Sequence, residues 1–211
     1  MKKIIVSLAI FIFINVASVL VAQNRTLIFK MQNITINDFE AEGYILAIGG
    51  GGEGTIGRLK GKQVIAVDIS KPELEEAPDG PLKIIMDARD LKFLDNTFNT
   101  VTSFFTLMYI DGHDHEKVFS EMFRVLKPEG KLLLWGAIIP KQTNSNQDRV
   151  LVPLTIKLPQ KVVRTGYGVR LPQEDHDLTY YINMSEKAGF NVILKESEDH
   201  AFHIIVQKPG L

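Results

Sequence analysis

The sequence reads ILAIGGGGEG at positions 45–54. Tyr44–Ile48 has the apolar character of a buried strand, and the glycines after it predict a tight turn that opens a short helix. Glycines let the backbone approach a ligand closely, and a helix N-terminus presents unpaired N–H groups to anionic oxygens. The stretch therefore predicts a nucleotide-binding loop at the end of the first core strand. Its glycines also satisfy the G-x-G-x-x-G pattern, at Gly49, Gly51 and Gly54.

The next expected strand also ends in a group that suits a nucleotide. It covers Gln63–Asp68 and ends in Asp68, 19 residues after Gly49. A carboxylate at that strand tip can accept hydrogen bonds from both hydroxyls of an adenosine ribose. The alternative for Asp68 is a charge stabilised by the N-terminus of the following helix.

A third expected strand, Leu82–Met86, ends in Asp87 and Ala88. The Asp87 carboxylate there can accept from the exocyclic amine of adenine, and an adjacent backbone N–H can meet a ring nitrogen. Asp87 is equally well interpreted as a loop aspartate that caps the turn at Arg89.

The rest of the chain alternates short apolar runs with amphipathic stretches. Strands that alternate with helices pair in parallel through right-handed crossovers, and two final strands joined by a tight turn pair as a hairpin. The sequence therefore predicts an α/β fold: a Rossmann-like, doubly wound, mostly parallel seven-stranded sheet with an antiparallel closing strand. The expected strands are 44–48, 63–68, 82–86, 100–105, 131–138, 190–197 and 201–208, and the main helices are 70–77, 114–126 and 178–188.

Residues 139–175 interrupt this pattern and predict a β-hairpin insertion. Val150–Leu158 and Lys161–Arg170 are its two strands, each bounded by proline or glycine. The stretch 141–170 holds six basic residues and one acidic residue, Asp148. This charge favours contact with an anionic substrate or with lipid headgroups. The alternative is a solvated hairpin whose charged edge deters aggregation.

The run FRVLKPEGKLLL at Phe123–Leu134 predicts a helix end, a turn and a buried strand. It occurs with the glycine loop, the carboxylates that end the second and third strands, and the segment TFNTVTSFFTLMYI at 97–110. Together these features resemble the class I S-adenosylmethionine-dependent methyltransferases, in particular the small-molecule type built around an RVLKPGG block. The resemblance covers about Gly43–Ile138, and the closing hairpin fits the reversed last strand of that family.

The resemblance implies an enzyme that binds S-adenosyl-L-methionine and transfers its methyl group to a small-molecule or lipid-like acceptor. It implies that Asp68 holds the ribose, that Ile69 packs on the adenine, and that Phe104 faces the methyl donor. Two positions depart from the family: Ala47 stands where an acidic residue is usual, and Glu53 where a third glycine is common. The cofactor-binding residues that the resemblance implies are Ile48, Gly49, Gly50, Gly51, Asp68, Ile69, Asp87, Ala88 and Phe104.

Methyl transfer from a sulfonium is an in-line displacement that requires the donor and acceptor to be close and aligned. It requires no metal, and it requires a general base only when the acceptor starts protonated, so no catalytic residue is assigned. Met108 and Tyr109 follow the fourth strand and are candidate substrate contacts; the alternative is a core-packing pair. The cluster Asp111–His115 lacks distant ligands and predicts no metal site; its Asp114 is expected to cap the next helix.

Two other functions stay open from the sequence. A nicotinamide-dependent oxidoreductase with an NAD(P)-binding Rossmann half explains the glycine loop and Asp68, but neither the RVLKPEG run nor the closing hairpin. A non-catalytic member of the methyltransferase fold, acting as a binding module, is motivated by Ala47 and by the apolar N-terminal segment.

Composition excludes further classes. The chain has no cysteine, which excludes a disulfide scaffold, an iron–sulfur site and a cysteine nucleophile. Residues 1–30 carry four basic residues and no acidic one, which leaves a net charge of −5 on residues 31–211. Because phosphate neutralisation supplies most nucleic-acid affinity, this charge predicts no nucleic-acid partner.

Residues 1–30 are expected to form a separate segment, followed by a methyltransferase-like domain at 31–211. Residues 4–22 carry no charge and follow two lysines, which is typical of a signal peptide or a membrane anchor. A third interpretation is translation from Met31. We expect membrane association through residues 4–22 and the basic hairpin 141–170, with the domain in the cytoplasm. Export through a cleaved signal peptide is the alternative.

Overall fold

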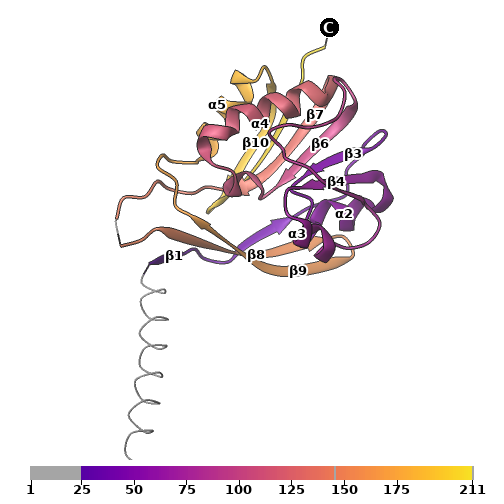
Figure 1. Ribbon diagram of the computed structural model, residues 1–211. Helices are drawn as coiled ribbons and strands as arrows, with labels where there is room; N and C mark the ends of the chain where they lie inside the picture. Colours follow the sequence, from indigo (N-terminus) through magenta and orange to yellow (C-terminus); the bar gives the residue numbers. More distant parts are fainter. Residues whose placement is uncertain (1–24, 145, 211) are drawn as a thin grey trace, which may run out of the picture.

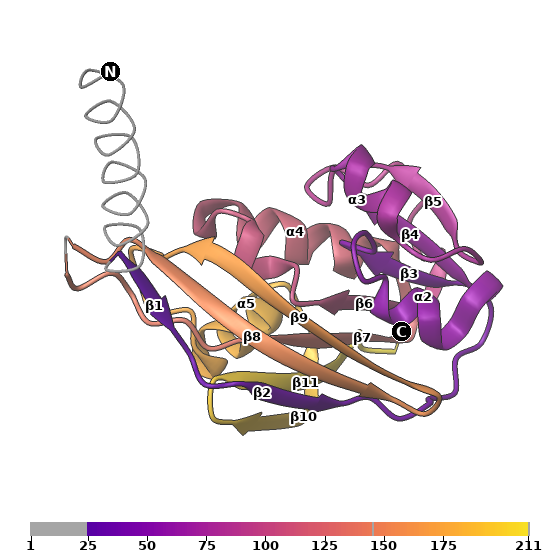
Figure 2. The ribbon, with the colours of Figure 1, turned by 90° about the horizontal axis from the view of Figure 1, so that it is seen from below.

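Two β-sheets organise the chain, and helices cover the outside of the larger one (Figures 1 and 2). The structure is a computed structural model, and it describes residues 25–144 and 146–210. The apolar segment at residues 4–22 lies outside this part of the chain. Within the described part, no helix is long and apolar enough to cross a bilayer.

The larger sheet has seven strands in the order β10-β11-β7-β6-β3-β4-β5. The pairs among β3, β4, β5, β6 and β7 are parallel, whereas β11 is antiparallel to both β7 and β10. This confirms the predicted doubly wound, mostly parallel sheet with a reversed closing strand. The strands are β3 (Ile45–Ile48), β4 (Val64–Asp68), β5 (Leu82–Ile85), β6 (Phe98–Phe104), β7 (Leu126–Ala137), β10 (Asn191–Glu198) and β11 (Ala201–Gln207).

The strand order reverses around β3, which has β4 on one side and β6 on the other. In open α/β sheets, ligands bind at such a switch point, beyond the carboxyl ends of the strands. Every residue of β3 is buried, so its side chains serve the core and leave binding to the loop that follows. The fold therefore brings the glycine loop, Asp68 and Phe104 to one edge of the sheet.

One face of this sheet is covered by α4 (Gly112–Val125) and α5 (Leu178–Lys187), as Figure 1 shows. α4 begins two residues before the expected position, because Asp111 caps it by accepting a hydrogen bond from the His113 N–H. The prediction that Asp114 is the cap was therefore wrong; Asp114 lies in the first turn and pairs with Arg89. The shorter helices α2 (Thr55–Lys60) and α3 (Lys71–Glu76) flank the glycine loop.

The opposite face is covered by a second sheet that contains the predicted hairpin. Its strands β8 (Arg149–Leu158) and β9 (Lys161–Arg170) pair antiparallel, and two short strands, β1 (Thr26–Ile28) and β2 (Gln32–Thr35), pair parallel with β8. Alternate residues of β8 point inward and are fully buried against the larger sheet: Val150, Val152, Leu154 and Ile156.

β1 and β2 were not expected from the sequence. The predicted boundary between residues 30 and 31 falls between these two strands, and Phe29 is buried in the core shared by the two sheets. A chain that started at Met31 would therefore lose a strand and a core residue.

Candidate cofactor site

The first glycine of the loop has no room for a side chain. Gly49 has a φ of 66°, and a Cβ atom there would lie 2.1 Å from Thr106 Oγ1. The Thr106 hydroxyl donates a hydrogen bond to the Ile48 carbonyl, with an O–O distance of 3.0 Å. Only glycine combines this backbone conformation with this close approach, so the loop lies directly on the chain that follows β6.

Asp68 at the end of β4 is bonded to the same loop. The Gly51 N–H donates to Asp68 Oδ2 at 3.2 Å, and the Ser70 N–H donates to Asp68 Oδ1 at 2.9 Å. α3 is capped by Ser70, whose hydroxyl accepts from the Glu73 N–H. The structure thus brings the loop and the second-strand carboxylate together, as their spacing in the sequence predicted.

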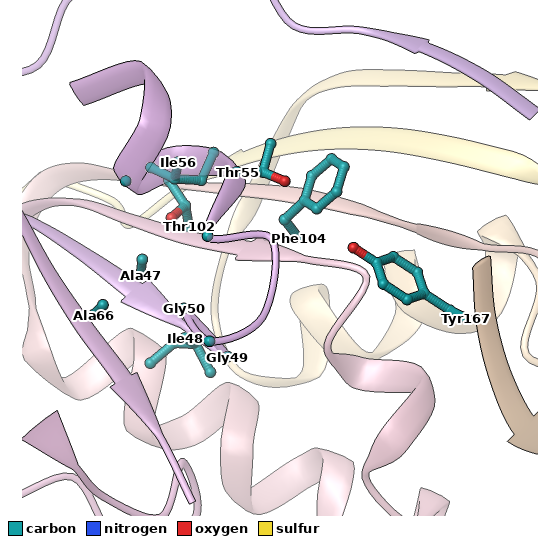
Figure 3. A pocket seen from close by; sticks show the side chains of 13 residues that line it. Ala47, Ile48, Gly49, Gly50, Thr55, Ile56, Ala66, Thr102, Phe104 and Tyr167 are labelled. Atoms are coloured by element: carbon teal, nitrogen blue, oxygen red, sulfur yellow. The ribbon is translucent and has the colours of Figure 1, made fainter. Parts of the chain in front are cut away.

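A small cavity of about 30 Å³ lies under the loop (Figure 3). Its wall includes the Thr102 hydroxyl, which is buried and has no hydrogen-bond partner among the described residues. A buried polar atom of this kind calls for a water or a ligand atom, and the cavity has room for one such small group beside the loop. Five predicted residues line it, Ile48, Gly49, Gly50, Gly51 and Phe104, together with Ala47, Gly54, Thr55, Ile56, Gly57, Ala66, Thr102 and Tyr167.

Residues 46–134 match the family model of the methyltransferase domain. They extend from β3 into β7 and include the glycine loop, Asp68 and Phe104. The chain carries a class I, S-adenosylmethionine-dependent methyltransferase domain. No curated protein matches the chain in sequence.

Solved structures share the fold of this methyltransferase domain at low sequence identity. The PH0226 protein of Pyrococcus horikoshii has a TM-score of 0.58 and 21% identity over 79% of this chain and 82% of that one. A SAM-dependent methyltransferase of Methanosarcina mazei has a TM-score of 0.58 and 17% identity over 82% and 95%. One from Mesorhizobium loti has a TM-score of 0.56 and 14% identity over 80% and 93%. These likenesses establish the fold alone.

The residues predicted to bind adenine lie outside the cavity, along the strand ends of the methyltransferase domain. Ile69 is 66% exposed, and Asp87 is bonded to Arg89 through its N–H, Nε and guanidinium NH2 group, at 2.7–3.0 Å. This guanidinium holds the pKa of Asp87 below its usual range. The turn-capping role of Asp87 is therefore present, and adenine recognition by Asp87 and the half-buried Ala88 stays a prediction.

The tip of β6 turns sharply toward the cavity. Phe105 has a φ of 53° although it is bulky and only 2% exposed, and its N–H donates to the Trp135 carbonyl at 2.7 Å. A non-glycine residue in this region is strained, and such strain concentrates at functional sites. Here it leaves Phe104 in the cavity wall and Thr106 under Gly49.

The two candidate substrate residues separate in the structure. Met108 packs against the core shared by the two sheets, as the core-packing alternative stated. Tyr109 is 57% exposed, and its ring meets that of Tyr167 edge-on with centroids 6.2 Å apart. Partial desolvation and the charges of Glu53 and Glu73 raise the pKa of Tyr109 to about 12.

Acidic side chains surround the glycine loop. Glu53 belongs to the loop, Asp68 is bonded to it, and a Cβ atom on Gly52 would lie 2.7 Å from Glu73 Oε2. Partial burial and the charges of Glu76, Asp68 and Glu53 raise the pKa of Glu73. The loop edge is thus negative.

The histidine-containing segment after β6 serves packing. His115 is fully buried; its Nε2 lies 2.9 Å from the Leu107 carbonyl and its Nδ1 2.8 Å from the Tyr180 hydroxyl. Because a carbonyl only accepts, Nε2 carries the proton and Nδ1 accepts from Tyr180. Within residues 25–144 and 146–210, no three His, Asp or Glu side chains are grouped as metal ligands.

A larger cavity of about 330 Å³ lies between β2 and the β10–β11 hairpin. Its wall includes Trp135, whose ring stacks on His203 with centroids 4.5 Å apart and lies 6.1 Å from the ring of Phe104. Trp135 therefore connects the wall of this cavity with Phe104, which lines the smaller cavity.

Sequence reasoning missed Thr102, Thr165 and Tyr167. The alternation of Val163, Thr165, Tyr167 and Val169 with charged residues and glycines marks one inward face of β9. That alternation predicts that Tyr167 faces the interior, but it does not predict its contact with Glu53 of the glycine loop, 114 residues away.

Proposed function

We propose that the protein transfers a methyl group from S-adenosylmethionine to a small-molecule or lipid-like acceptor near the tip of β6. The observation that carries this proposal is the glycine loop bonded to Asp68 at the switch point of the sheet. In this arrangement Asp68 would hold the ribose, Ile69 the adenine face, and the loop the amino-acid end. The cofactor supplies an electrophilic methyl group, and the chain aligns it and excludes water.

Charge around the loop favours this cofactor over a nicotinamide dinucleotide. S-adenosylmethionine carries a sulfonium, an ammonium and one carboxylate, which give a net charge of +1, whereas the pyrophosphate of a dinucleotide carries two negative charges. At an effective dielectric constant of about 20, a unit charge about 6 Å from a carboxylate contributes roughly 3 kcal/mol. The carboxylates of Glu53, Asp68 and Glu73 therefore attract the first ligand and repel the second.

The cavity beside Trp135 supports the small-molecule branch of the proposal. Its volume of about 330 Å³ lies in the range of small-ligand sites. Its rim carries Glu196, Glu198 and Asp199, which disfavours an anionic acceptor.

The outer face of the second sheet supports a membrane-associated protein. The register places four exposed basic residues on the side away from the core, and β1, β2, β8 and β9 contain no acidic residue. An anionic lipid surface attracts such a face by about 1 kcal/mol for each basic side chain near it. The four residues are Arg149, Lys157, Arg164 and Arg170.

Isothermal titration calorimetry tests the cofactor. We expect S-adenosylhomocysteine to bind and NADH and NADPH not to bind. Asp68→Ala should weaken the binding about 10- to 100-fold, because a charge-assisted ribose contact is lost. Asp79→Ala, which changes an exposed carboxylate after α3, is the matched control and should leave the affinity unchanged.

Each competing function predicts a different result. Binding of NADH alone would establish the oxidoreductase. Binding of S-adenosylhomocysteine without transfer of labelled methyl from S-adenosylmethionine to any component of a small-molecule and lipid extract would establish the non-catalytic module.

A further inference from the structure

Glu53 is presented by the glycine loop to the hairpin insertion. It lies between Gly52 and Gly54, with φ values of 56° and 53°. Its backbone is fixed from the other side, because Arg58 Nε donates to the Glu53 carbonyl at 2.6 Å. The side chain therefore has a defined direction, toward β9.

Two hydroxyl groups of β9 hold the Glu53 carboxylate. The Tyr167 hydroxyl donates to Oε2 at 2.8 Å, and the Thr165 hydroxyl donates to Oε1. Thr165 and Tyr167 are two residues apart on one strand, so both side chains point to the same face. Burial and the Glu53 charge raise the pKa of Tyr167 well above its usual range, so this hydroxyl keeps its proton and remains a donor.

The Glu53 carboxylate has no cationic partner among the described residues, although it is half-buried. Both of its hydrogen bonds come from neutral hydroxyls, which leave its negative charge uncompensated. A partly buried charge is stabilised by an opposite charge close by. The position therefore suits a cationic group of a ligand.

The carboxylate is also bonded to a residue of the cavity wall. Tyr167 lines that cavity, and its hydroxyl points toward Phe104 and the loop (Figure 3). The ring of Tyr167 lies 5.7 Å from that of Phe105, on the β6 side of β3, whereas Asp68 ends β4 on the other side. No charged side chain lines the cavity itself, where Ala47 contributes only a methyl group. Glu53 is thus the carboxylate available to the end of the ligand that lies away from Asp68.

We propose that Glu53, held by Thr165 and Tyr167 of the hairpin insertion, binds the α-ammonium of the cofactor's amino-acid end. This inference rests on the proposed function. It makes the insertion part of the cofactor site, in addition to any contact with the acceptor. It also explains why a carboxylate, rather than glycine, stands at this position of the loop.

Two ligands that differ in one part separate this role from loop support. S-adenosylhomocysteine carries the amino-acid end, and 5′-methylthioadenosine keeps the adenosine and the thioether but lacks that end. Both are titrated calorimetrically into the full chain. Glu53→Gln should weaken S-adenosylhomocysteine about 10-fold or more, since a hydrogen bond to a charged group is lost, and should change 5′-methylthioadenosine less than about 2-fold.

Tyr167→Phe keeps the ring and removes one donor, so it should weaken S-adenosylhomocysteine about 3-fold and leave 5′-methylthioadenosine unchanged. It also provides the test if Glu53→Gln does not fold. Glu75→Gln, at an exposed glutamate paired with Lys71 on α3, is the control and should alter neither affinity.

Equal losses for the two ligands, or no loss for either, would overturn the role of Glu53 while leaving the proposed function intact. Failure of the unaltered protein to bind either ligand would refute the proposed function, and this inference with it.

Discussion

Substituting Gly49 by alanine tests how the glycine loop is built. The added Cβ atom would lie 2.1 Å from Thr106 Oγ1 and 2.7 Å from Thr106 Cβ, and the residue has a φ of 66°. The unfavourable φ and the clash with Thr106 are linked. A change of φ at residue 49 would move the Ile48 carbonyl, which accepts a hydrogen bond from Thr106 at 3.0 Å. The substitution therefore acts on the β3 end of the loop and on the β6 tip together.

The expected destabilisation has three parts. A left-handed φ costs alanine about 1 kcal/mol more than glycine, the lost Thr106 hydrogen bond contributes about 1 kcal/mol, and overpacking adds about 1–3 kcal/mol. The sum is about 3–5 kcal/mol, a large fraction of the about 5–15 kcal/mol that stabilises a typical domain.

Urea denaturation of three glycine variants separates these parts. A Cβ atom at Gly168 meets nothing within 4 Å and its φ is ordinary, whereas Gly61 has open space but a φ of 54°. We expect almost no change for Gly168→Ala, about 1 kcal/mol for Gly61→Ala and about 3–5 kcal/mol for Gly49→Ala, at equal m-values. A Gly49→Ala variant no less stable than Gly61→Ala would refute the close packing of Thr106 on the loop.

Three further perturbations have defined outcomes. Thr102→Val removes a buried, unpartnered hydroxyl and should raise the unfolding free energy of the ligand-free protein by about 1 kcal/mol; a loss of stability in urea denaturation would show that the hydroxyl is bonded. Burial lowers the pKa of His176 to about 4, so the unfolded chain takes up a proton on this side chain at a higher pH than the folded protein does. The folded protein therefore keeps its full stability above about pH 6.5 and loses stability as the pH falls toward 4. Unfolding free energy should drop by about 2 kcal/mol from pH 7 to pH 5 through this group, and His176→Phe, which keeps the stack on Tyr180, should flatten that slope. The full chain should sediment more with anionic than with neutral vesicles. A variant with glutamate at all four basic positions of the outer face should lose this preference, and a preference that persists would exclude the basic face as its cause. The four positions are Arg149, Lys157, Arg164 and Arg170.

The centre of the larger sheet was predictable because strands such as β3 and β6 are buried on both faces and therefore appear as continuous apolar runs. The bounds of β7 differ from the expected strand at 131–138. The turn expected at Lys127–Gly130 is an irregular stretch of one long strand, in which Glu129 has a φ of 64° and the register to β6 shifts between Phe98 and Thr100. Proline and glycine signals mark such an interruption, but they do not say whether the strand resumes its pairing.

The second sheet was predictable only in part. The β8–β9 hairpin follows from local alternation and a short turn. β2 has the sequence QNIT and little intrinsic preference for a strand, and it forms because β8, more than 100 residues away, offers a free edge. The site shows the same contrast. The loop residues could be predicted from their spacing along the sequence, whereas the positions of Thr165 and Tyr167 depend on a contact with Glu53, more than 100 residues away.

β9 joins two surfaces that the sequence kept apart. Its inward residues Thr165 and Tyr167 hold Glu53 at the glycine loop, and its outward neighbours Arg164 and Arg170 belong to the basic face. Successive residues of a strand point to opposite faces, so one backbone segment carries both sets. A force that moves the basic face therefore also moves the hydroxyl groups at the cofactor loop. If the cofactor binds at this loop as proposed, the hairpin insertion is a structural part of the cofactor site.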